Sequence, residues 1–137
     1  MTECLDVAVA LIMDKMRRVL ITQRAPHSVG GGYWEFPGGK LEAKESASEA
    51  LVRELQEEVG LHVLEHTFLE RFDYAYPTRV VSLWVYHVSH FAGEARCCEA
   101  QQDLRWVTLC DLRHYRLLEA SQLLLTKTAL LSISSNI

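Results

Sequence analysis

The sequence predicts one domain of mixed α/β (α+β) class spanning residues 1–137. Segments with the apolar or alternating patterns of β-strands outnumber the two segments with a helical pattern. Hydrophobic residues make up 49% of the chain and charged residues 23%, an ordinary composition for a domain that buries a core. Internal repeats and low-complexity linkers, which would suggest a second domain, are absent from the sequence.

The chain begins with strand patterns. Residues 6–13 are almost continuously apolar, as expected for a central strand buried on both faces. A polar turn at 14–17 leads to a second strand at 19–23, and we expect these two strands to form a hairpin. The loop 27–32 holds three consecutive glycines, which predicts mobility, and residues 34–36 form a short extended segment.

A helix is predicted from Ser46 to Val59. Ser46 with Glu49 three residues later is a capping-box pattern, and Gly60 is a natural residue just past a helix end. Beyond it, strands at 61–76 and 80–88 are predicted to form a hairpin through a turn containing proline.

The last part of the chain follows a polar loop. Residues 105–109 predict a short strand, and residues 119–131 predict an apolar helix. Its leucines are expected to pack on the sheet, with a dimer contact as the alternative, so the oligomeric expectation is a monomer or a homodimer.

Three carboxylates occupy unfavourable positions on the first helix. Glu54, Glu57 and Glu58 stand at i, i+3 and i+4, and the helical period puts Glu58 inside the apolar stripe. Glu57 and Glu58 also lie at the negative end of the helix dipole. Arg53 is expected to point away from the cluster. A hard divalent cation, Mg²⁺ or Mn²⁺, would relieve these costs, whereas the plain alternative is a solvated acidic face.

A glycine-rich segment leads into this helix. Phe36, Pro37, Gly38, Gly39 and Lys40 follow one another, and two glycines let the backbone turn sharply and approach a ligand. The carbonyl of Gly39 is therefore a further candidate oxygen ligand.

The spacing of these residues is similar to a known motif. The matching positions are Gly39, Glu45, Arg53-Glu54-Leu55, Glu57-Glu58 and Gly60-Leu61. They fit every fixed position of the Nudix box. The flanking segments Gln23-Arg24, Trp34 to Lys40, Tyr76-Pro77 with Arg79, and Ser82 to Trp84 resemble those of MutT-type nucleoside triphosphate pyrophosphohydrolases.

The resemblance implies an α-β-α sandwich with a mixed β-sheet. It implies Mg²⁺-dependent hydrolysis of a nucleoside triphosphate to the monophosphate and pyrophosphate, which would sanitise the nucleotide pool. Oxidised guanine nucleotides such as 8-oxo-dGTP, or a pyrimidine triphosphate, are the expected substrates. Two alternatives remain: hydrolysis of another nucleoside diphosphate derivative (ADP-ribose, a nucleotide sugar or a dinucleoside polyphosphate), and a non-catalytic sensor.

The resemblance also assigns roles around the metal. The expected metal ligands are Gly39, Glu54, Glu57, Glu58 and Glu99. The expected catalytic residues are Glu54, Glu57, Glu58 and Arg53, with Glu54 as the base, although ligand and base can exchange assignments. Arg53 is expected to brace the loop and helix through Glu45. Glu99 shares its loop with other acids, so a solvated loop carboxylate is the alternative.

Four residues are expected to bind the nucleotide. Arg24 and Arg79 resemble residues that contact sugar or phosphates, with a solubilising surface role as the alternative. Phe36 could stack on the base or simply belong to the core. Oxidised-guanine enzymes have an asparagine that reads the purine edge, and the nearest stretch here, residues 119–122, has none. That reader is therefore either absent or replaced by Ser121 or Gln122.

Charge and cysteines limit the partners. A formal net charge of −4 without a basic block argues against a nucleic-acid polymer and favours a small nucleotide. The N-terminal apolar run is too short for a membrane span. Four cysteines without disulfide or zinc spacing predict reduced thiols and a cytoplasmic protein.

Overall fold

The computed structural model describes residues 3–127. In chain order the elements are β1 (Glu3–Ile12), β2 (Arg18–Gln23), β3 (Trp34–Glu35), β4 (Gly38–Lys40), α1 (Ala47–Val59), β5 (His62–Tyr76), β6 (Arg79–Ala92), β7 (Asp103–Thr108), the 3-10 helix η1 (Leu109–His114) and α2 (Glu119–Lys127). The short helix η1 was not predicted from the sequence. The predicted last residues of the C-terminal helix, 128–131, lie outside the described residues.

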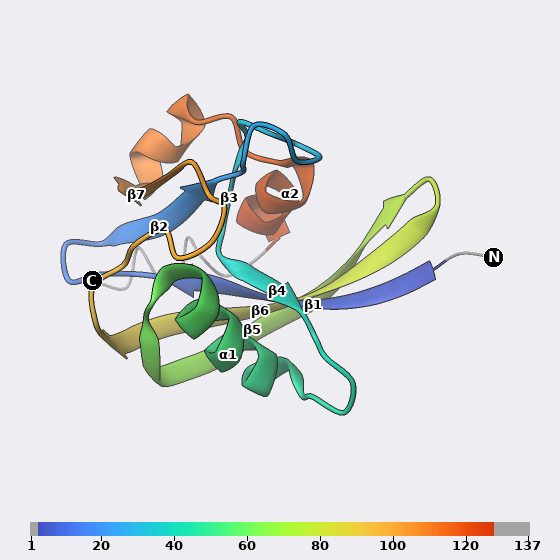
Figure 1. Ribbon diagram of the computed structural model, residues 1–137, viewed down its shortest axis with the longest axis horizontal. Coiled ribbons are helices and arrows are strands. Elements are labelled where there is room, and N and C mark those ends of the chain that lie inside the picture. The colour runs from blue at the N-terminus through green and yellow to red at the C-terminus, as the bar shows by residue number, and fades with distance from the viewer. Residues whose placement is uncertain (1–2, 128–137) are drawn as a thin grey trace.

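The strands form two sheets, which confirms the mixed α+β class. The larger sheet has the order β4-β1-β6-β5, and its β1–β6 pair is parallel while its other two pairs are antiparallel. The smaller sheet, β3-β2-β7, is antiparallel. Figure 1 shows α1 on one side of the larger sheet and β2, β7 and α2 on the other.

The central strand β1 is buried on both faces, as predicted. Val9 and Leu11 belong to one hydrophobic core, which the larger sheet shares with the smaller sheet and α2. Ala8, Ala10 and Ile12 point to the second core, which includes the apolar face of α1. The small alanine side chains let the helix come close to the sheet.

Helix α1 begins and ends where the sequence indicates. The Ser46 side chain accepts from the Glu49 backbone N–H, and the Glu49 carboxylate accepts from the Ser46 N–H, so the predicted capping box is present. Gly60 adopts φ 71°, a left-handed conformation that ends the helix. Leu55 and Val59 are fully buried, and burial of one such side chain contributes about 1.5–3 kcal/mol. The helix is therefore a rigid base for its carboxylates.

The predicted hairpin between the first two strands is wrong. A turn does follow β1, closed by a hydrogen bond from the Asp14 N–H to the Arg18 carbonyl at 3.0 Å, and within residues 3–127 one isolated bridge, between Met13 and Val19, pairs the two segments beyond it. The edges of β1 are already hydrogen-bonded to β6 and β4. Strand β2 therefore belongs to the smaller sheet, where it pairs with β7 and β3.

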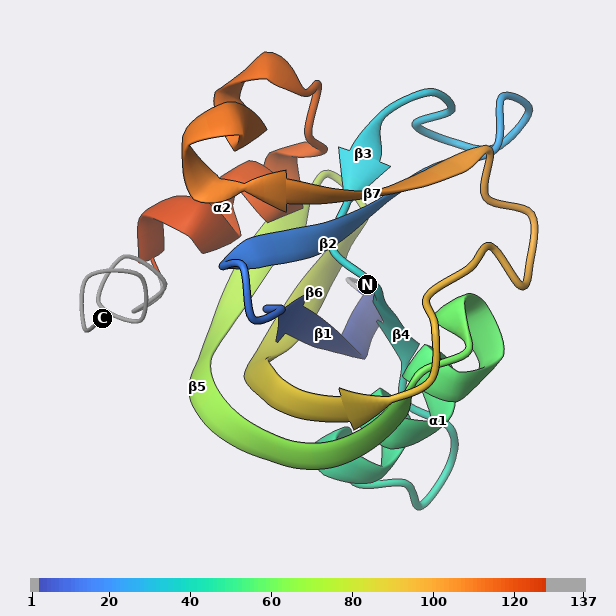
Figure 2. The same ribbon diagram turned by 90° about the vertical axis from the view of Figure 1, so that its left-hand side faces the viewer.

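The second hairpin, β5–β6, is confirmed and longer than predicted. Register shifts near Val63 and Phe68 interrupt the ladder, and such bulges bend strands. Figure 2 shows both strands curving round the other elements. The tip of the hairpin carries Tyr76 and Arg79 to the side of β1.

Other expectations concern the thiols, the last helix and the membrane. Cys4, Cys97, Cys98 and Cys110 are all free cysteines, in agreement with the predicted thiols, and all four are exposed. On α2, Leu124 packs in the core against the sheets, also as predicted. Within residues 3–127, no helix is long and apolar enough to cross a membrane.

Candidate active site

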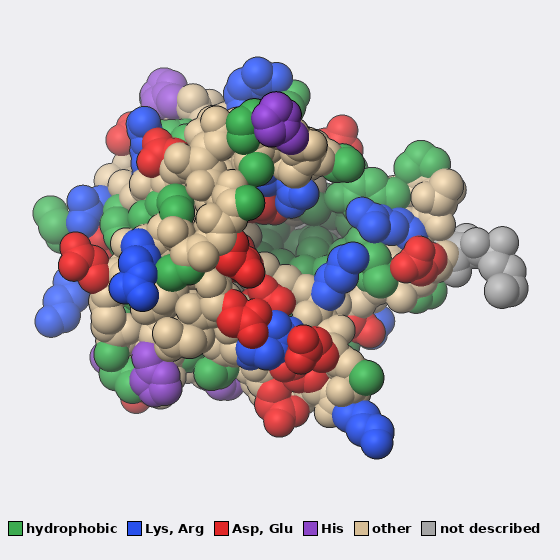
Figure 3. Space-filling view, in the orientation of Figure 1, with side chains coloured by type: hydrophobic (Ala, Val, Ile, Leu, Met, Phe, Trp, Pro, Cys, Tyr) green, Lys and Arg blue, Asp and Glu red, His purple; other side chains and the backbone are tan. Residues whose placement is uncertain are grey.

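Two hollows that share Arg24 and Glu35 in their linings open at the surface, and the second of them touches α1 through Glu58. The first, here called the apolar pocket, is lined mainly by aliphatic side chains of β1, β6 and α2, among them Val7, Val9, Leu83 and Leu124. The second, here called the acidic cleft, is lined by Glu35, Glu58 and Glu99 together with Arg24 and neutral residues. Figure 3 shows a hollow with an apolar floor, acidic side chains on one side and basic side chains on its rim.

Glu58 is the residue of α1 that lines the acidic cleft. As the helical period predicts, its side chain is turned toward the interior, where its one hydrogen bond comes from the Gly38 N–H at 3.3 Å. Burial, helped by the nearby carboxylates of Glu54, Glu35 and Glu99, raises the pKa of Glu58 to about 8. Glu58 is thus a partly buried carboxyl group among other acids, and no basic side chain between residues 3 and 127 bonds to it. A divalent cation would stabilise the ionised form of such a group.

Glu54 lies one turn before Glu58 and touches the glycine segment. A Cβ added at Gly39 would overlap the Glu54 carboxyl group, so only glycine allows this close approach. Burial raises the pKa of Glu54, although a hydrogen bond from Arg53 at 2.9 Å acts in the opposite direction. The backbone of Gly39 and a carboxylate with a raised pKa therefore stand side by side.

The prediction that Arg53 points away from the acids is wrong. Its guanidinium donates to Glu45 at 2.7 and 2.9 Å, to Glu54 at 2.9 Å and to Glu57 at 3.2 Å. The arginine side chain is long, so its guanidinium can reach acids before and after it in the chain. A helical wheel gives only the direction of the Cα atom and therefore does not show this reach. The predicted Glu45–Arg53 ion pair is confirmed, and its hydrogen bonds lower the pKa of Glu45 to about 2.

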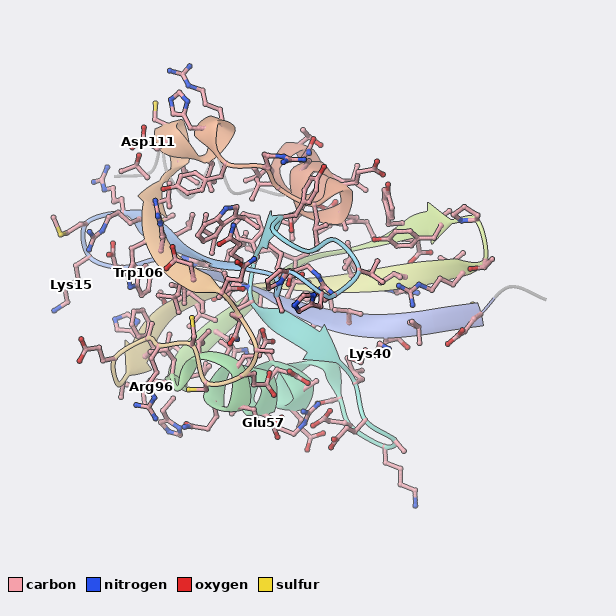
Figure 4. The ribbon with its side chains drawn as sticks, turned by 45° about the horizontal axis from the view of Figure 1, so that its top comes forward. Lys15, Lys40, Glu57, Arg96, Trp106 and Asp111 are labelled. Atoms are coloured by element: carbon pink, nitrogen blue, oxygen red, sulfur yellow. The ribbon has the colours of Figure 1, made fainter. Side chains whose placement is uncertain are left out.

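The three helix carboxylates do not all face one point. Glu57 is half-exposed and bonded to Arg53, and Figure 4 shows it at the surface of α1, with Lys40 on the adjacent strand β4. Among residues 3–127, no three His, Cys, Asp or Glu side chains are grouped so that they could hold a metal ion as they stand. Side-chain rotation of Glu57 and Glu54 away from Arg53 would be needed to join Glu58 around a cation.

Glu99 is brought to the acidic cleft by the loop between β6 and β7. That loop is bound to the end of α1, because the Cys98 N–H and the Gln101 side chain both donate to the Glu58 carbonyl, at 3.0 and 2.9 Å. Asp103, another acid of this segment, pairs with Arg105. Of the acids in this loop, Glu99 is the one that lines the cleft.

The four predicted nucleotide-binding residues lie around one cavity. Arg24, Phe36, Arg79 and Ser121 all line the apolar pocket. Phe36 is 4% exposed, so it serves at once as core residue and pocket wall. The Ser121 side chain is buried in the wall formed by α2, and its hydroxyl has no hydrogen bond to any other residue of the described part. Arg79 stacks over Tyr76, 5.3 Å from its ring centre.

Comparison with known proteins decides the family. The family model for the NUDIX domain matches residues 4–127. This chain belongs to the NUDIX domain family. The family prediction from the sequence is therefore confirmed, while the prediction that one domain fills residues 1–137 stays a prediction.

Several relatives of this Nudix chain are known. The 8-oxo-dGTP diphosphatase of Proteus vulgaris is 43% identical over 90 residues, which are 66% of this chain and 80% of that protein. The CTP pyrophosphohydrolase of Escherichia coli (strain K12) is 35% identical over 112 residues, 82% of each chain. A solved structure from work on MutT of Aliivibrio salmonicida and Vibrio cholerae has a TM-score of 0.79 at 36% identity, covering 91% of this chain and 96% of that one.

The two hollows also contain residues to which the sequence analysis gave no role. Glu35, Lys40 and Tyr76 line the apolar pocket beside the predicted residues. The signal for Glu35 was present, since it is a charged residue between the aromatic residues Trp34 and Phe36. The sequence could not show that its side chain would also reach the acidic cleft.

Proposed function

We propose that this Nudix protein is a Mg²⁺-dependent nucleoside triphosphate pyrophosphohydrolase that releases a nucleoside monophosphate and pyrophosphate. One observation carries the proposal: the partly buried carboxylate of Glu58 lies in a cleft that shares Arg24 and Glu35 with an apolar pocket. The cleft suits a cation and a polyphosphate, and the pocket suits a base. The named activities of the relatives support the same reaction class.

The proposed cation site uses the residues predicted from the sequence. The Gly39 carbonyl and the carboxylates of Glu54, Glu57, Glu58 and Glu99 would hold Mg²⁺, or Mn²⁺ in its place. When bound, such an ion neutralises phosphate oxygens and acts as a Lewis acid on the phosphoanhydride. The two hollows share Arg24 and Glu35, so the phosphate chain would run past that pair from the pocket into the cleft.

The proposed base is Glu54. Burial raises its pKa, which brings the group closer to the pH at which a carboxylate accepts a proton from water efficiently. Arg53 holds it in place from one side and Gly39 leaves room for it on the other. The water oxygen attacks phosphorus, its proton passes to Glu54, and the phosphoanhydride bond breaks with pyrophosphate as the other product.

The proposed base contacts are Phe36 and Ser121. Phe36 would stack on the base, and Ser121 would meet its polar edge. A hydroxyl group donates to a carbonyl and accepts from an amino group equally well. We therefore propose a substrate range that includes both oxidised guanine and cytosine triphosphates, in keeping with the names of the relatives.

A substrate panel tests the function. Canonical and oxidised nucleoside triphosphates, ADP-ribose, a nucleotide sugar and a dinucleoside polyphosphate are each incubated with Mg²⁺, Mn²⁺ or EDTA, and the products are separated. We expect pyrophosphate from at least one triphosphate, and none with EDTA. Untouched triphosphates beside a cleaved diphosphate derivative would overturn the proposal, and so would Mg²⁺-indifferent nucleotide binding without any hydrolysis.

The remaining partner expectations stay predictions. They are a small nucleotide as the partner rather than a nucleic-acid polymer, a cytoplasmic location, and a monomeric or homodimeric state.

A further inference from the structure

Arg24 and Glu35 stand where the two hollows meet. Both residues line the apolar pocket and the acidic cleft. Glu35 lies on β3, which pairs with β2, and Arg24 directly follows β2. Their side chains form an ion pair at 3.2 Å and are only 33% and 29% exposed. This ion pair is therefore partly shielded from water at the narrow part of the proposed substrate path.

The guanidinium of Arg24 is held at two of its three nitrogens. Nε donates to the Val29 carbonyl at 2.7 Å, and Nη1 donates to both carboxylate oxygens of Glu35 at 3.2 and 3.3 Å. Its backbone is also fixed, because the Gln102 side chain donates to the Arg24 carbonyl at 2.9 Å. Nη2 donates to no other residue between 3 and 127, so it is the nitrogen left for a ligand.

Glu35 is an unfavourable partner in this position. Burial raises its pKa even though Arg24 lies beside it, and its charge also raises the pKa of Glu58. An extra acid next to a repulsive carboxylate cluster costs stability. A surface ion pair elsewhere would avoid this cost, so the placement points to a role of the pair in the cleft.

We propose that Glu35 is a positioning residue, which orients Arg24 so that Nη2 donates to the phosphate chain of the bound nucleotide. The proposal rests on the proposed function, because it assigns the anion to the substrate of that reaction. Glu35 acts through Arg24 and touches neither the substrate nor the cation. Its removal should therefore matter only while Arg24 is present.

A double-mutant cycle tests this dependence. The variants Arg24→Ala, Glu35→Ala and the double variant are compared in kcat and KM with CTP and 8-oxo-dGTP. Each single change should lower kcat/KM by about 10- to 100-fold, which is the loss expected when one hydrogen bond to a charged group is removed. The double variant should be no worse than Arg24→Ala, and Glu35→Gln should recover part of the loss, since its amide oxygen still accepts from Nη1. Glu65→Ala, which breaks the exposed pair with His90, is the control and should leave kcat/KM unchanged.

Additive losses would overturn the proposal, because Glu35 would then act independently of Arg24, for example on the cation. A Glu35→Ala variant as active as the wild type would overturn it as well. If the wild type hydrolyses neither triphosphate, the proposed function fails for them, and the same cycle measured on calorimetric dissociation constants for the two nucleotides still decides the positioning role. A wild type that binds neither nucleotide would refute both ideas.

Discussion

Glu45, just before helix α1, and Glu58, in its last turn, are carboxylates in different surroundings. On the side toward the preceding loop, Glu45 receives two hydrogen bonds from Arg53 and one from the Glu42 N–H, and its pKa falls to about 2. On the side toward the sheet, Glu58 is partly buried beside other acids, and desolvation raises its pKa to about 8. The same side-chain type is thus stabilised as an anion in one place and destabilised in the other.

This difference distinguishes carboxylates that stabilise the fold from carboxylates that can bind a cation or accept a proton. A carboxylate already paired with arginine gains little from a cation, whereas an unpaired buried one gains much. Glu54 lies between the two environments, because it accepts from Arg53 and also repels Glu58. The contrast therefore predicts a large functional role for Glu58, a shared one for Glu54, and a structural one for Glu45.

The largest effect is expected from Glu58→Gln. The amide keeps the shape of the side chain but removes the negative charge that would hold the cation, and with the cation the phosphates. We expect kcat to fall by about 10²–10⁴-fold, because a bound cation contributes several kcal/mol to transition-state stabilisation, while the fold is retained. Pyrophosphate release and circular dichroism would measure the two quantities. Glu49→Gln is the matched control on the same helix, since glutamine also serves in a capping box.

Near-native turnover of Glu58→Gln with Mg²⁺ would contradict the division between the two environments. An equal loss in Glu49→Gln would do the same, because it would show that any change of charge on the helix stops the reaction.

A smaller effect is expected from Gly39→Ala. The added methyl group would overlap the Glu54 carboxyl group, so Glu54 must rotate away from the glycine segment. The backbone of Gly39 is outside the left-handed region, so alanine brings no backbone strain. We expect kcat to fall by about tenfold or more, as when a positioned general base is displaced, while the melting temperature changes little. Unchanged kcat would show that the contact between Gly39 and Glu54 has no part in the reaction.

The sequence predicted the parts of this site that depend on local order. The caps of α1, the inward direction of Glu58 and the burial of β1 on both faces all follow from periodicity and nearest neighbours. The position of β2 did not follow, because pairing depends on which edges of β1 other strands have already taken.

The sequence also could not show which acids the Arg53 side chain would contact. A helical wheel places the Cα atom of Arg53, whereas its guanidinium is set by four rotatable bonds and by the acids it can reach. Glu35 was missed for a related reason, since its role depends on two hollows built from segments far apart in the chain.

The smallest effects, on stability, should have opposite pH dependence in the two environments. Without a metal ion, raising the pH from the ordinary glutamate value of 4.5 to about 8 ionises the unfolded Glu58 before the folded one, so the wild type loses stability over this range. Glu58→Gln should therefore be the more stable protein at pH 8, and the difference in unfolding free energy from the wild type should vanish toward pH 4.5.

For Glu45 the pH dependence is reversed: its contribution to stability is present above pH 4.5 and lost as the pH falls to about 2. Glu45→Gln should therefore have a lower free energy of unfolding than the wild type at pH 7 and match it near pH 2. Urea unfolding in EDTA across these pH values measures both, and parallel slopes for the two variants would show that the two environments are electrostatically alike.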